Sequence, residues 1–390
     1  MLQDKNLLVV SSTYNTFVKD QVDIIANHVN KVTVSIRYNP IANVSRFFPL
    51  IKTGIPFYLE NILNLNDVPP NLNVEISKLF YLPIDLFQYK VGETYFKKLS
   101  SKKRLISSSN LIHSHFIYPQ GYVGLRLKQE YNLPLVITAH RYDIFLAFKN
   151  EKWRKKIAYT LRNADKVICV SPHYEEMIKK LDTRINTTVI PNGFNNKLFS
   201  VMDTFSCRKK LGLPLNKKII LNVGYLSKRK GQMDLILAIN ELVKKRKDVL
   251  CVIVGDGDIR YNLEYLIKKN NLSDYVKLVG AKKHEEIPLW MNACDLFAIP
   301  SYNEGFAVIN VEAFSCGKPV VSTINGGSEY IVTSDDYGYL VNPGDITKLT
   351  EMIEIALDKE WNNQAIADYT KNYDWNKIVQ QILGIYKELL

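Results

Sequence analysis

The chain of 390 residues is long enough for two α/β cores of ordinary size. Hydrophobic residues make up 46% and charged residues 23%, which excludes a disordered chain. The net charge of +12 arises in the first half, because residues 1–200 hold 27 Lys and Arg against 15 Asp and Glu, whereas residues 201–390 hold 24 of each. No zinc-finger, helix-turn-helix or RNA-recognition pattern accompanies this excess, so nucleic acid is not the expected partner.

Short β-branched runs alternate with helical patterns, which indicates parallel sheets connected by crossover helices. The expected helices include Lys19–Asn30, Met233–Arg246, Asn262–Asn270 and an amphipathic last helix over about Trp375–Leu390. In the first half the expected strands are Leu7–Val10, Lys31–Ile36, Leu111–His113, Leu135–Thr138, Lys166–Val170 and Thr188–Ile190. In the second half they are Lys218–Val223, Leu250–Val254, Val276–Val279, Leu296–Ile299 and Pro319–Ser322.

The pattern restarts near residue 200. Asn192-Gly193 marks a turn, a polar stretch follows, and a new buried strand begins after Gly212-Leu213-Pro214. We therefore expect an α/β protein with two domains, 1–198 and 199–373, and a C-terminal helix over 374–390 that packs back on the first domain.

The segment Ile41–Arg104 departs from this alternation. It ends in the basic run Lys97–Arg104, and a second basic cluster, Lys152–Lys156, surrounds Trp153. Either these are solvated helix faces beside ordinary core, or they form an interfacial contact with an anionic membrane. The apolar and aromatic residues of the segment are Phe47, Phe48, Ile55, Phe57, Tyr58, Leu79, Phe80 and Tyr81.

No targeting or membrane-spanning segment is expected. The apolar run Leu7–Val10 is too short for a signal peptide, and the uncharged run Leu105–Leu125 contains histidines and three successive serines. Five cysteines without a C-x-x-C pair indicate buried free thiols. The expected location is the cytoplasm, with the inner face of the cell membrane as an alternative.

The strongest chemical signal is the stretch from Glu304 to Ala313, which follows an apolar strand and opens a helix expected over about Phe306–Cys316. A helix N-terminus beyond a parallel strand offers free N–H groups to a diphosphate. Glu304 can accept hydrogen bonds from sugar hydroxyls, and Glu312 can reach the hydroxyls of a ribose. Two carboxylates that flank a phosphate-binding terminus match a sugar-diphosphate-nucleoside.

A basic turn follows the first strand of the second half. Gly224 allows the chain to turn tightly, and the three successive cations Lys228, Arg229 and Lys230 suit anionic oxygens. Further on, Asp256-Gly257-Asp258 resembles a metal-binding D-x-D, but it lies in a glycine turn without a third ligand. We therefore expect no metal site.

Histidines follow two strands of the first half. His140 comes directly after the strand Leu135–Thr138, at the edge where α/β proteins bind ligands, and can donate to a sugar hydroxyl or a phosphate. His113 and His115 point the same way on their strand and are expected to be structural or to line an acceptor site.

Together these motifs resemble the retaining glycosyltransferases of family 4, over nearly the whole chain. The resemblance implies the GT-B fold, with two Rossmann-like doubly wound domains facing each other across a cleft, the first for the acceptor and the second for a nucleotide sugar. The stretch from His113 to Tyr122 is similar to members that build cell-surface polysaccharides or glycans on lipid carriers. The matching motifs are Glu304 with Glu312, Pro191-Asn192-Gly193-Phe194, Lys230-Gly231, Gly255-Asp256-Gly257, and Ser315-Cys316-Gly317-Lys318-Pro319-Val320-Val321 before Gly326-Gly327.

The resemblance also implies roles for individual residues. Glu304 and His140 are expected at the donor sugar, Glu312 at the ribose, and Lys230 at the diphosphate. Two positions depart from the family pattern, since members often carry Arg in place of Tyr225 and Gly in place of Arg141. Further donor-binding residues are expected to be Gly224, Arg229, Gly305, Phe306, Ala307, Val308, Gly326 and Gly327, and acceptor-side residues to be Arg141, Asp143 and His115.

The implied reaction moves a hexosyl unit from a nucleoside diphosphate sugar to a hydroxyl of a glycan or lipid-linked acceptor, with retention and without metal or other cofactor. The expected catalytic residues are His140, Glu304 and Lys230. No carboxylate nucleophile is evident in the first domain, so front-face substitution is expected, with the departing phosphate taking the acceptor's proton. Two alternatives stay open: a nucleotide-sugar 2-epimerase, and a non-catalytic nucleotide-sugar-binding partner of a membrane complex.

Overall fold

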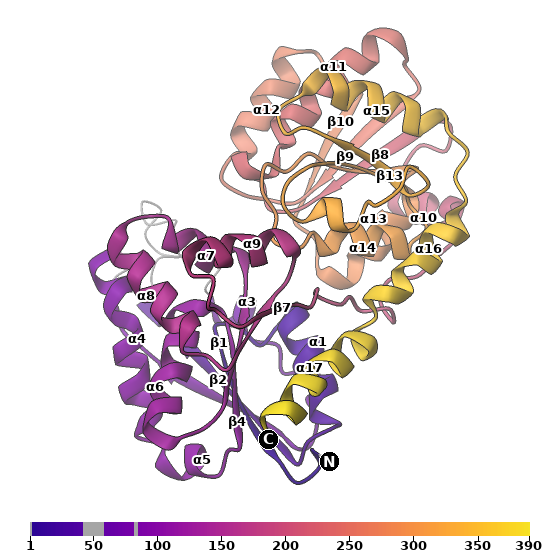
Figure 1. Ribbon diagram of the computed structural model, residues 1–390. Helices are drawn as coiled ribbons and strands as arrows, with labels where there is room; N and C mark the ends of the chain where they lie inside the picture. The colour runs from indigo at the N-terminus through magenta and orange to yellow at the C-terminus, as the bar shows by residue number, and fades with distance from the viewer. Residues whose placement is uncertain (1, 42–57, 82–84) are drawn as a thin grey trace. The chain divides into compact units, whose positions relative to one another are not determined.

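The computed structural model describes residues 2–41, 58–81 and 85–390, apart from the side chains at positions 61, 85–88 and 141–143. The chain divides into two compact units (Figure 1). Unit 1 consists of Met1–Gly193 and Trp375–Leu390, and unit 2 of Phe194–Asp374. Phe47, Phe48, Ile55 and Phe57, which the sequence placed in the aromatic segment, lie outside the described residues.

Unit 1 is a parallel sheet with helices on both faces. Within the described residues its strand order is β3-β2-β1-β4-β5-β6-β7. The strands are β1 (Asn6–Ser11), β2 (Lys31–Tyr38), β3 (Leu72–Lys78), β4 (Leu111–His115), β5 (Leu135–Ala139), β6 (Lys166–Cys169) and β7 (Thr187–Val189). The helices are α1 (Thr16–Ala26), α3 (Leu59–Ile62), α4 (Asp85–Ser100), α5 (Lys103–Ser107), η3 (Ile117–Gly121), α6 (Tyr122–Tyr131), α7 (Arg141–Ala147), α8 (Glu151–Arg162) and α9 (Pro172–Leu181).

The C-terminal helix α17 (Trp375–Leu389) belongs to unit 1 and packs beside α1. Its apolar face, from Trp375 to Tyr386, joins the core cluster under β1 and β2. Gly193 packs flat on the indole of Trp375, where a Cβ at position 193 would lie 2.4 Å from the ring. The chain leaves unit 1 after Gly193, five residues before the boundary that the sequence suggested, because this glycine is still fixed to α17.

Unit 2 is a second parallel sheet, in the order β10-β9-β8-β11-β12-β13 within the described residues. The predicted α/β class with two Rossmann-like domains is confirmed. The strands are β8 (Lys218–Val223), β9 (Val249–Val254), β10 (Val276–Gly280), β11 (Leu296–Ile299), β12 (Val320–Thr323) and β13 (Gly338–Val341). The helices are α10 (Thr204–Leu211), η4 (Lys228–Lys230), α11 (Gln232–Lys245), α12 (Arg260–Lys269), η5 (His284–Glu286), α13 (Ile287–Ala293), α14 (Val308–Ser315), η6 (Ser328–Tyr330), α15 (Ile346–Asp358), α16 (Asn363–Tyr369) and η7 (Thr370–Tyr373).

The sequence missed two edge strands and misplaced two helix starts. Within the described residues, β3 and β13 pair on one side only, and several of their apolar residues are only half buried. α1 begins before Lys19, at Thr16, because Asn15 caps it with its side-chain oxygen. α14 begins at Val308 instead of Phe306, and the residues before it form a loop.

Two further findings concern the cysteines and the membrane. All five cysteines are free and buried, and burial raises the pKa of Cys169, Cys251, Cys294 and Cys316 to about 12. Among the described residues, no helix combines the length and hydrophobicity that crossing a bilayer would need.

Candidate active site

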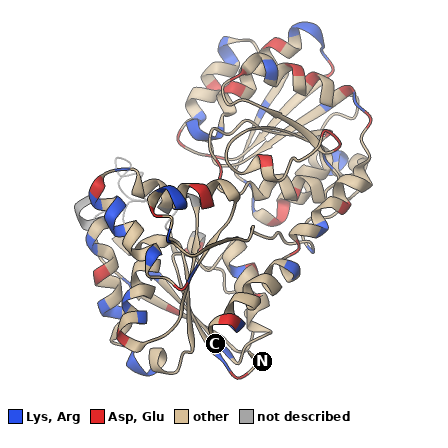
Figure 2. Ribbon diagram, viewed as in Figure 1, with Lys and Arg blue, Asp and Glu red and all other residues tan. Residues whose placement is uncertain are grey.

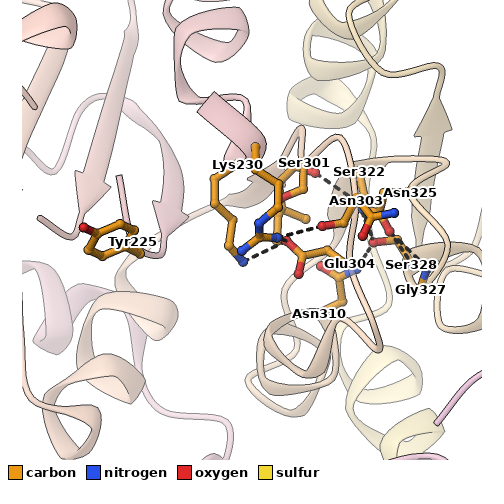
Figure 3. Close-up of polar contacts among 12 residues, drawn as sticks. Tyr225, Lys230, Ser301, Asn303, Glu304, Asn310, Ser322, Asn325, Gly327 and Ser328 are labelled. Carbon is orange, nitrogen blue, oxygen red and sulfur yellow. Dashed lines mark hydrogen bonds and ion pairs between the residues drawn. The ribbon is translucent and has the colours of Figure 1, made fainter. Parts of the chain in front are cut away.

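In unit 2, three loops follow parallel strands and therefore share one edge of the sheet, here called the carboxyl edge. The first loop leads from β8 to η4, the second from β11 to α14, and the third from β12 to η6. They carry most of the residues that the sequence assigned to the donor. Figure 3 shows how these side chains converge.

The centre of this edge is an ion-paired triad of Arg229, Lys230 and Glu304. The Nζ of Lys230 lies 2.7 Å from Oε1 of Glu304, and a guanidinium nitrogen of Arg229 lies 3.1 Å from the same oxygen. Arg229 also donates to the carbonyl of Asn303 at 2.7 Å. The structure thus brings together residues from two separate sequence motifs. Arg229 and Lys230 belong to the basic turn, and Glu304 lies 75 positions after Arg229.

The carboxylate of the triad is buried, with 8% of Glu304 exposed. Burial alone would raise the pKa of Glu304, but the charges of Lys230 and Arg229, with a hydrogen bond from Lys230, lower it below its usual value. Glu304 is therefore ionised near neutral pH. Two cations against one carboxylate leave the triad with a net charge of +1, which suits an anionic ligand.

The position of the two cations depends on Gly231. Its φ of 68° lies in the left-handed region, and a Cβ at this position would lie 1.9 Å from the carbonyl oxygen of Pro300, at the end of β11. Only glycine allows η4 to approach this strand so closely. The close approach brings Arg229 and Lys230 to the loop that carries Glu304.

A buried hydrogen-bond network fixes the loop after β12 (Figure 3). The side-chain oxygen of Asn325 accepts from the backbone N–H groups of Gly327 and Ser328 at 3.2 and 2.9 Å. The hydroxyl of Ser328 contacts Ser322 and accepts from Asn310 and Asn325, each at 2.9 Å. Because Asn310 is on α14, the network ties this loop to the helix.

The backbone N–H groups at this edge fall into two classes. Those of Gly326 and Gly327 are used within the protein, since Gly326 donates to the carboxylate of Glu329 and Gly327 donates to Asn325. In the described part of the chain, those of Gly305, Phe306 and Ala307 have no protein acceptor. In this conformation the amides of Gly326 and Gly327 are engaged within the protein and shape the loop, and their role in donor binding stays a prediction.

The N–H of Val308 is likewise engaged, because it donates to the carbonyl of Phe306 at 2.8 Å, and its role in donor binding stays a prediction. The carbonyl of Gly305 faces Gly327, where a Cβ would come within 3.1 Å of it. The two glycine-containing loops are thus in close contact. The free amides at 305–307 can donate to a phosphate, beside the cations of the triad.

Glu312 lies one turn into α14 and is 7% exposed. One of its oxygens lies 3.6 Å from Nε2 of His284, at the start of η5. Partial desolvation lowers the pKa of His284, against the opposing charge of Glu285, although 41% of its side chain is exposed, so this imidazole is neutral at neutral pH. Such a pair can accept a hydrogen bond from a vicinal diol and donate another to it.

The aspartates after β9 have other partners. Asp258 accepts a hydrogen bond of 2.8 Å from the phenol of Tyr225, and Asp256 accepts from the N–H of Gly257. The side chain of Tyr225 lies away from Lys230 in Figure 3. Among the described residues, no cluster of three or more His, Cys, Asp or Glu could hold a metal ion.

In unit 1, three histidine rings lie in a row at the ends of β4 and β5. His113 and His115 are stacked with ring centroids 4.6 Å apart, and the ring of His140 follows at 5.7 Å from His115. His113 makes hydrogen bonds with Tyr386 at 2.6 Å and with Thr138 at 2.7 Å. This role is structural, because the bond to Tyr386 ties α17 to the sheet.

Burial determines the charge of the row. It lowers the pKa of His115 to about 3, and it lowers the pKa of His113 and His140 well below the usual value, with the neighbouring histidines adding to the effect. His115 is fully buried, so an acceptor does not reach it directly in this conformation. The side chains of Arg141 and Asp143 lie outside the described residues.

Four residues of the unit 2 site were not found from the sequence: His284, Asn310, Asn325 and Ser328. Asn325 stands before Gly326-Gly327 and carries an ordinary turn signal, which could have suggested its role. His284 is a single histidine in a polar stretch, without any pattern that links it to Glu312. Its role becomes visible only when η5 and α14 are placed side by side.

Comparisons with known proteins identify the family. Residues 203–373 match the family model of group 1 glycosyl transferases, and residues 75–197 match that of glycosyltransferase family 4. An uncharacterized glycosyltransferase of Methanocaldococcus jannaschii is 31% identical over 307 residues, covering 77% of this chain and 79% of the relative. A D-inositol 3-phosphate glycosyltransferase of Corynebacterium diphtheriae is 27% identical, covering 78% and 75% of the two chains.

Solved structures share the fold. Sucrose-phosphate synthase from Thermosynechococcus elongatus superimposes with a TM-score of 0.81, at 23% identity and with 99% of both chains covered. Anabaena HepE in complex with UDP and glucose superimposes with a TM-score of 0.74, at 23% identity, covering 99% of this chain and 100% of HepE. On the family models and the Methanocaldococcus relative, the chain belongs to the family 4 glycosyltransferases.

Proposed function

We propose that this glycosyltransferase moves a hexosyl unit from a nucleoside diphosphate sugar to a hydroxyl acceptor with retention at the anomeric carbon. The observation that carries the proposal is the net positive triad of Arg229, Lys230 and Glu304 next to the free amides at 305–307. Cations and unpaired N–H groups at one sheet edge are what a diphosphate leaving group needs. The complex of HepE with UDP supports a nucleoside diphosphate as the leaving group.

In the proposed reaction, the acceptor oxygen forms a bond to the anomeric carbon while the bond from that carbon to the phosphate oxygen breaks. The departing phosphate takes the proton of the acceptor hydroxyl. Lys230 and Arg229 stabilise the charge that develops on the phosphate, so the proposal needs no metal ion or other cofactor. Glu312 and His284 would hold the ribose hydroxyls, and His140 of unit 1 would donate to the sugar.

The donor is identified by thermal shift with a panel of UDP-, GDP- and ADP-sugars, since a ligand that binds only the folded state raises the melting temperature. The donor that stabilises is then incubated with lipid-linked and soluble glycan acceptors, with and without EDTA, and the anomeric configuration of the product is determined by NMR. Loss of transfer in EDTA, or an inverted product, would contradict the proposal. Epimerised sugar formed without an acceptor would indicate a 2-epimerase, and donor binding without any transfer a non-catalytic role.

We further propose that the acceptor is a lipid-linked or polysaccharide glycan at an anionic membrane surface, and that the first basic run provides the contact. This run borders a hollow of about 750 Å³ in unit 1. Its lining includes four cations, Lys31, Lys102, Lys103 and Arg104, and the single carboxylate of Glu75, which Lys102 already pairs. Lys103 and Arg104 are exposed and available to lipid headgroups. Figure 2 shows Lys and Arg, in blue, on several helices of unit 1.

The second basic cluster is less suited to this contact. The ammonium group of Lys156 lies against the rings of Tyr89, Tyr118 and Tyr122, at 3.9, 4.6 and 4.4 Å from their centroids. It donates to the carbonyl of Tyr89 at 2.9 Å, and burial lowers its pKa to about 8. Lys156 therefore stabilises the packing of α8 on α4 and η3.

Liposome flotation tests the membrane contact. The double variant Lys103→Glu/Arg104→Glu should lose binding to vesicles that contain anionic lipid, and Lys268→Glu/Lys269→Glu, which reverses two exposed charges of unit 2, should retain it. Equal binding by both variants, or no binding by the native protein, would contradict the proposal.

A further inference from the structure

One buried group of unit 1 has no function in the site described above. His115 is fully buried, and its Nε2 has no hydrogen-bond partner among the described residues. Its Nδ1 lies 3.4 Å from Nε2 of His140. A buried polar ring with one contact directed at a candidate catalytic residue suggests that His115 acts through that residue.

The protonation states limit how the two rings can bond. Since burial keeps both imidazoles neutral near pH 7, each ring carries one N–H and one unprotonated nitrogen. The contact between Nδ1 of His115 and Nε2 of His140 is a hydrogen bond only if one of these nitrogens is protonated and the other is not. Two arrangements are therefore allowed.

In the first arrangement, His140 donates from Nε2 to Nδ1 of His115. The proton of His115 is then on its Nε2, where a buried N–H has no acceptor among the described residues. In the second arrangement, Nδ1–H of His115 donates to Nε2 of His140. The unpartnered Nε2 of His115 is then an unprotonated nitrogen, and buried acceptors without a partner are tolerated more often than buried donors.

We propose that His115 is a positioning residue, which donates from Nδ1 to Nε2 of His140 and thereby fixes His140 as the tautomer with its proton on Nδ1. His140 is then a neutral hydrogen-bond donor, and its Nε2 is not available as a base. The assignment of the tautomer rests on the contact between the two rings, on the unpartnered Nε2 of His115 and on the neutral state of both imidazoles. Its effect on turnover rests on the proposed function, in which His140 donates to the sugar.

The surroundings hold both rings in place. His113, fixed at both nitrogens, stacks on one face of His115. The ring of His140 contacts Phe116 with centroids 4.6 Å apart and Phe17 at 5.1 Å. Phe116 has a φ of 76°, in a region that bulky residues rarely adopt and that persists only where the surroundings enforce it.

The tautomer can be observed directly by NMR. The chain has six histidines, so long-range proton–nitrogen correlation spectra of protein labelled at its histidine nitrogens are simple enough to assign with single variants. The expected result for the native protein at pH 7 is a protonated Nδ1 and an unprotonated Nε2 in His140. A His140 that is protonated on Nε2, or that carries both protons, would overturn the proposal without any measurement of activity.

Two variants then test the role of His115. His115→Phe keeps an aromatic ring but removes the donor, so His140 should become a mixture of tautomers and kcat should fall by about 10-fold to 100-fold. His115→Asn places an amide N–H at the position of Nδ1–H. It should restore most of the native tautomer of His140 and most of the native kcat. A His140 spectrum unchanged in His115→Phe would refute the proposal, whereas a tautomer change without loss of kcat would instead contradict the proposed role of His140. If His115→Phe does not fold, the native spectrum alone decides.

Discussion

The carboxyl edges of the two sheets differ in electrostatics although both belong to Rossmann-like units. The edge of unit 2 buries the ionised Glu304 and compensates it with Lys230 and Arg229. The edge of unit 1 buries a row of three neutral histidines, among them His115 and His140. One architecture thus provides a charged site or a neutral one, depending only on the residues that follow the strands.

The difference has a physical consequence for ligands. A buried carboxylate with two cations keeps an excess positive charge in a place where water screens it weakly, which favours a diphosphate. Neutral imidazoles offer hydrogen bonds without net charge, which favours hydroxyl groups. The two edges should therefore respond differently to the loss of a cation and to acid.

The largest effect on turnover is expected for a variant that removes a cation from the charged edge of unit 2. Lys230→Ala removes one of the two cations that we propose stabilise the leaving group, and it should lower kcat by about 10²–10³. The matched control is Lys228→Ala, since Lys228 is an exposed neighbour in η4 and should be dispensable. Steady-state kinetics with a saturating donor measures both. Full turnover by Lys230→Ala would show that the triad has no part in leaving-group stabilisation.

Acid should act on the neutral edge. The unfolded chain binds protons at histidines near pH 6.5, whereas His113, His115 and His140 stay neutral in the folded state, so stability is lost as pH falls below 6.5. At pH 5.5 each histidine contributes a loss of about 1.4 kcal/mol, or about 4 kcal/mol for the three. Asp20 in α1 acts in the opposite direction, because burial raises its pKa to about 6 and the folded state therefore takes up a proton as the pH falls. This uptake offsets about 1 kcal/mol of the loss in stability.

A net loss of about 3 kcal/mol is therefore expected for unit 1 between pH 7.5 and 5.5. Hydrogen exchange measured on peptides of each unit separates unit 1 from unit 2, where Glu304 stays ionised over this range because its pKa is lowered. Equal protection of unit 1 peptides at both pH values, after correction for the intrinsic exchange rate, would mean that the histidines are charged or exposed in the folded state.

The same contrast shows what could be predicted from the sequence. The strands with buried β-branched runs, such as β8 and β11, were predicted with their observed bounds. The motifs also pointed to Lys230 and Glu304, which the structure brings into contact, whereas their role in binding stays a prediction. The edge strand β3 was missed because only one of its apolar residues, Leu72, is buried, while Val74 and Ile76 are half buried. A motif indicates candidate binding side chains through their residue type and position. It indicates much less about the residues that surround them.

Partners that are distant in sequence were beyond such reasoning. His284 meets Glu312 because η5 packs near α14, and Tyr386 reaches His113 across 273 positions. The use of the Gly326 and Gly327 amides within the protein depends on Glu329 and Asn325, whose side chains turn back on the loop. Neither the motif nor the spacing indicates which amides remain unpaired, because this depends on the local conformation.

The smallest effect on turnover is expected for a variant that removes hydrogen bonds of the loop after β12 and keeps the charged triad. Asn325→Ala removes an amide that accepts from two backbone N–H groups and donates to Ser328, while leaving the triad untouched. The buried partners are left unpaired, so unit 2 should lose about 1–3 kcal/mol in urea unfolding. Turnover should fall less than in Lys230→Ala, because no charge at the leaving group is removed.

Asn262→Ala is the matched control, since Asn262 is exposed on α12 of the same unit and its replacement should change stability by less than about 0.5 kcal/mol. If both variants have the same urea midpoint, the hydrogen-bond network does not fix the loop. The conformation of the backbone amides at this edge then has another cause. If Asn325→Ala is less stable but retains the Kd for the donor, the network stabilises the fold alone. A joint loss of stability and donor affinity would link the rigid loop to the charged edge that it adjoins.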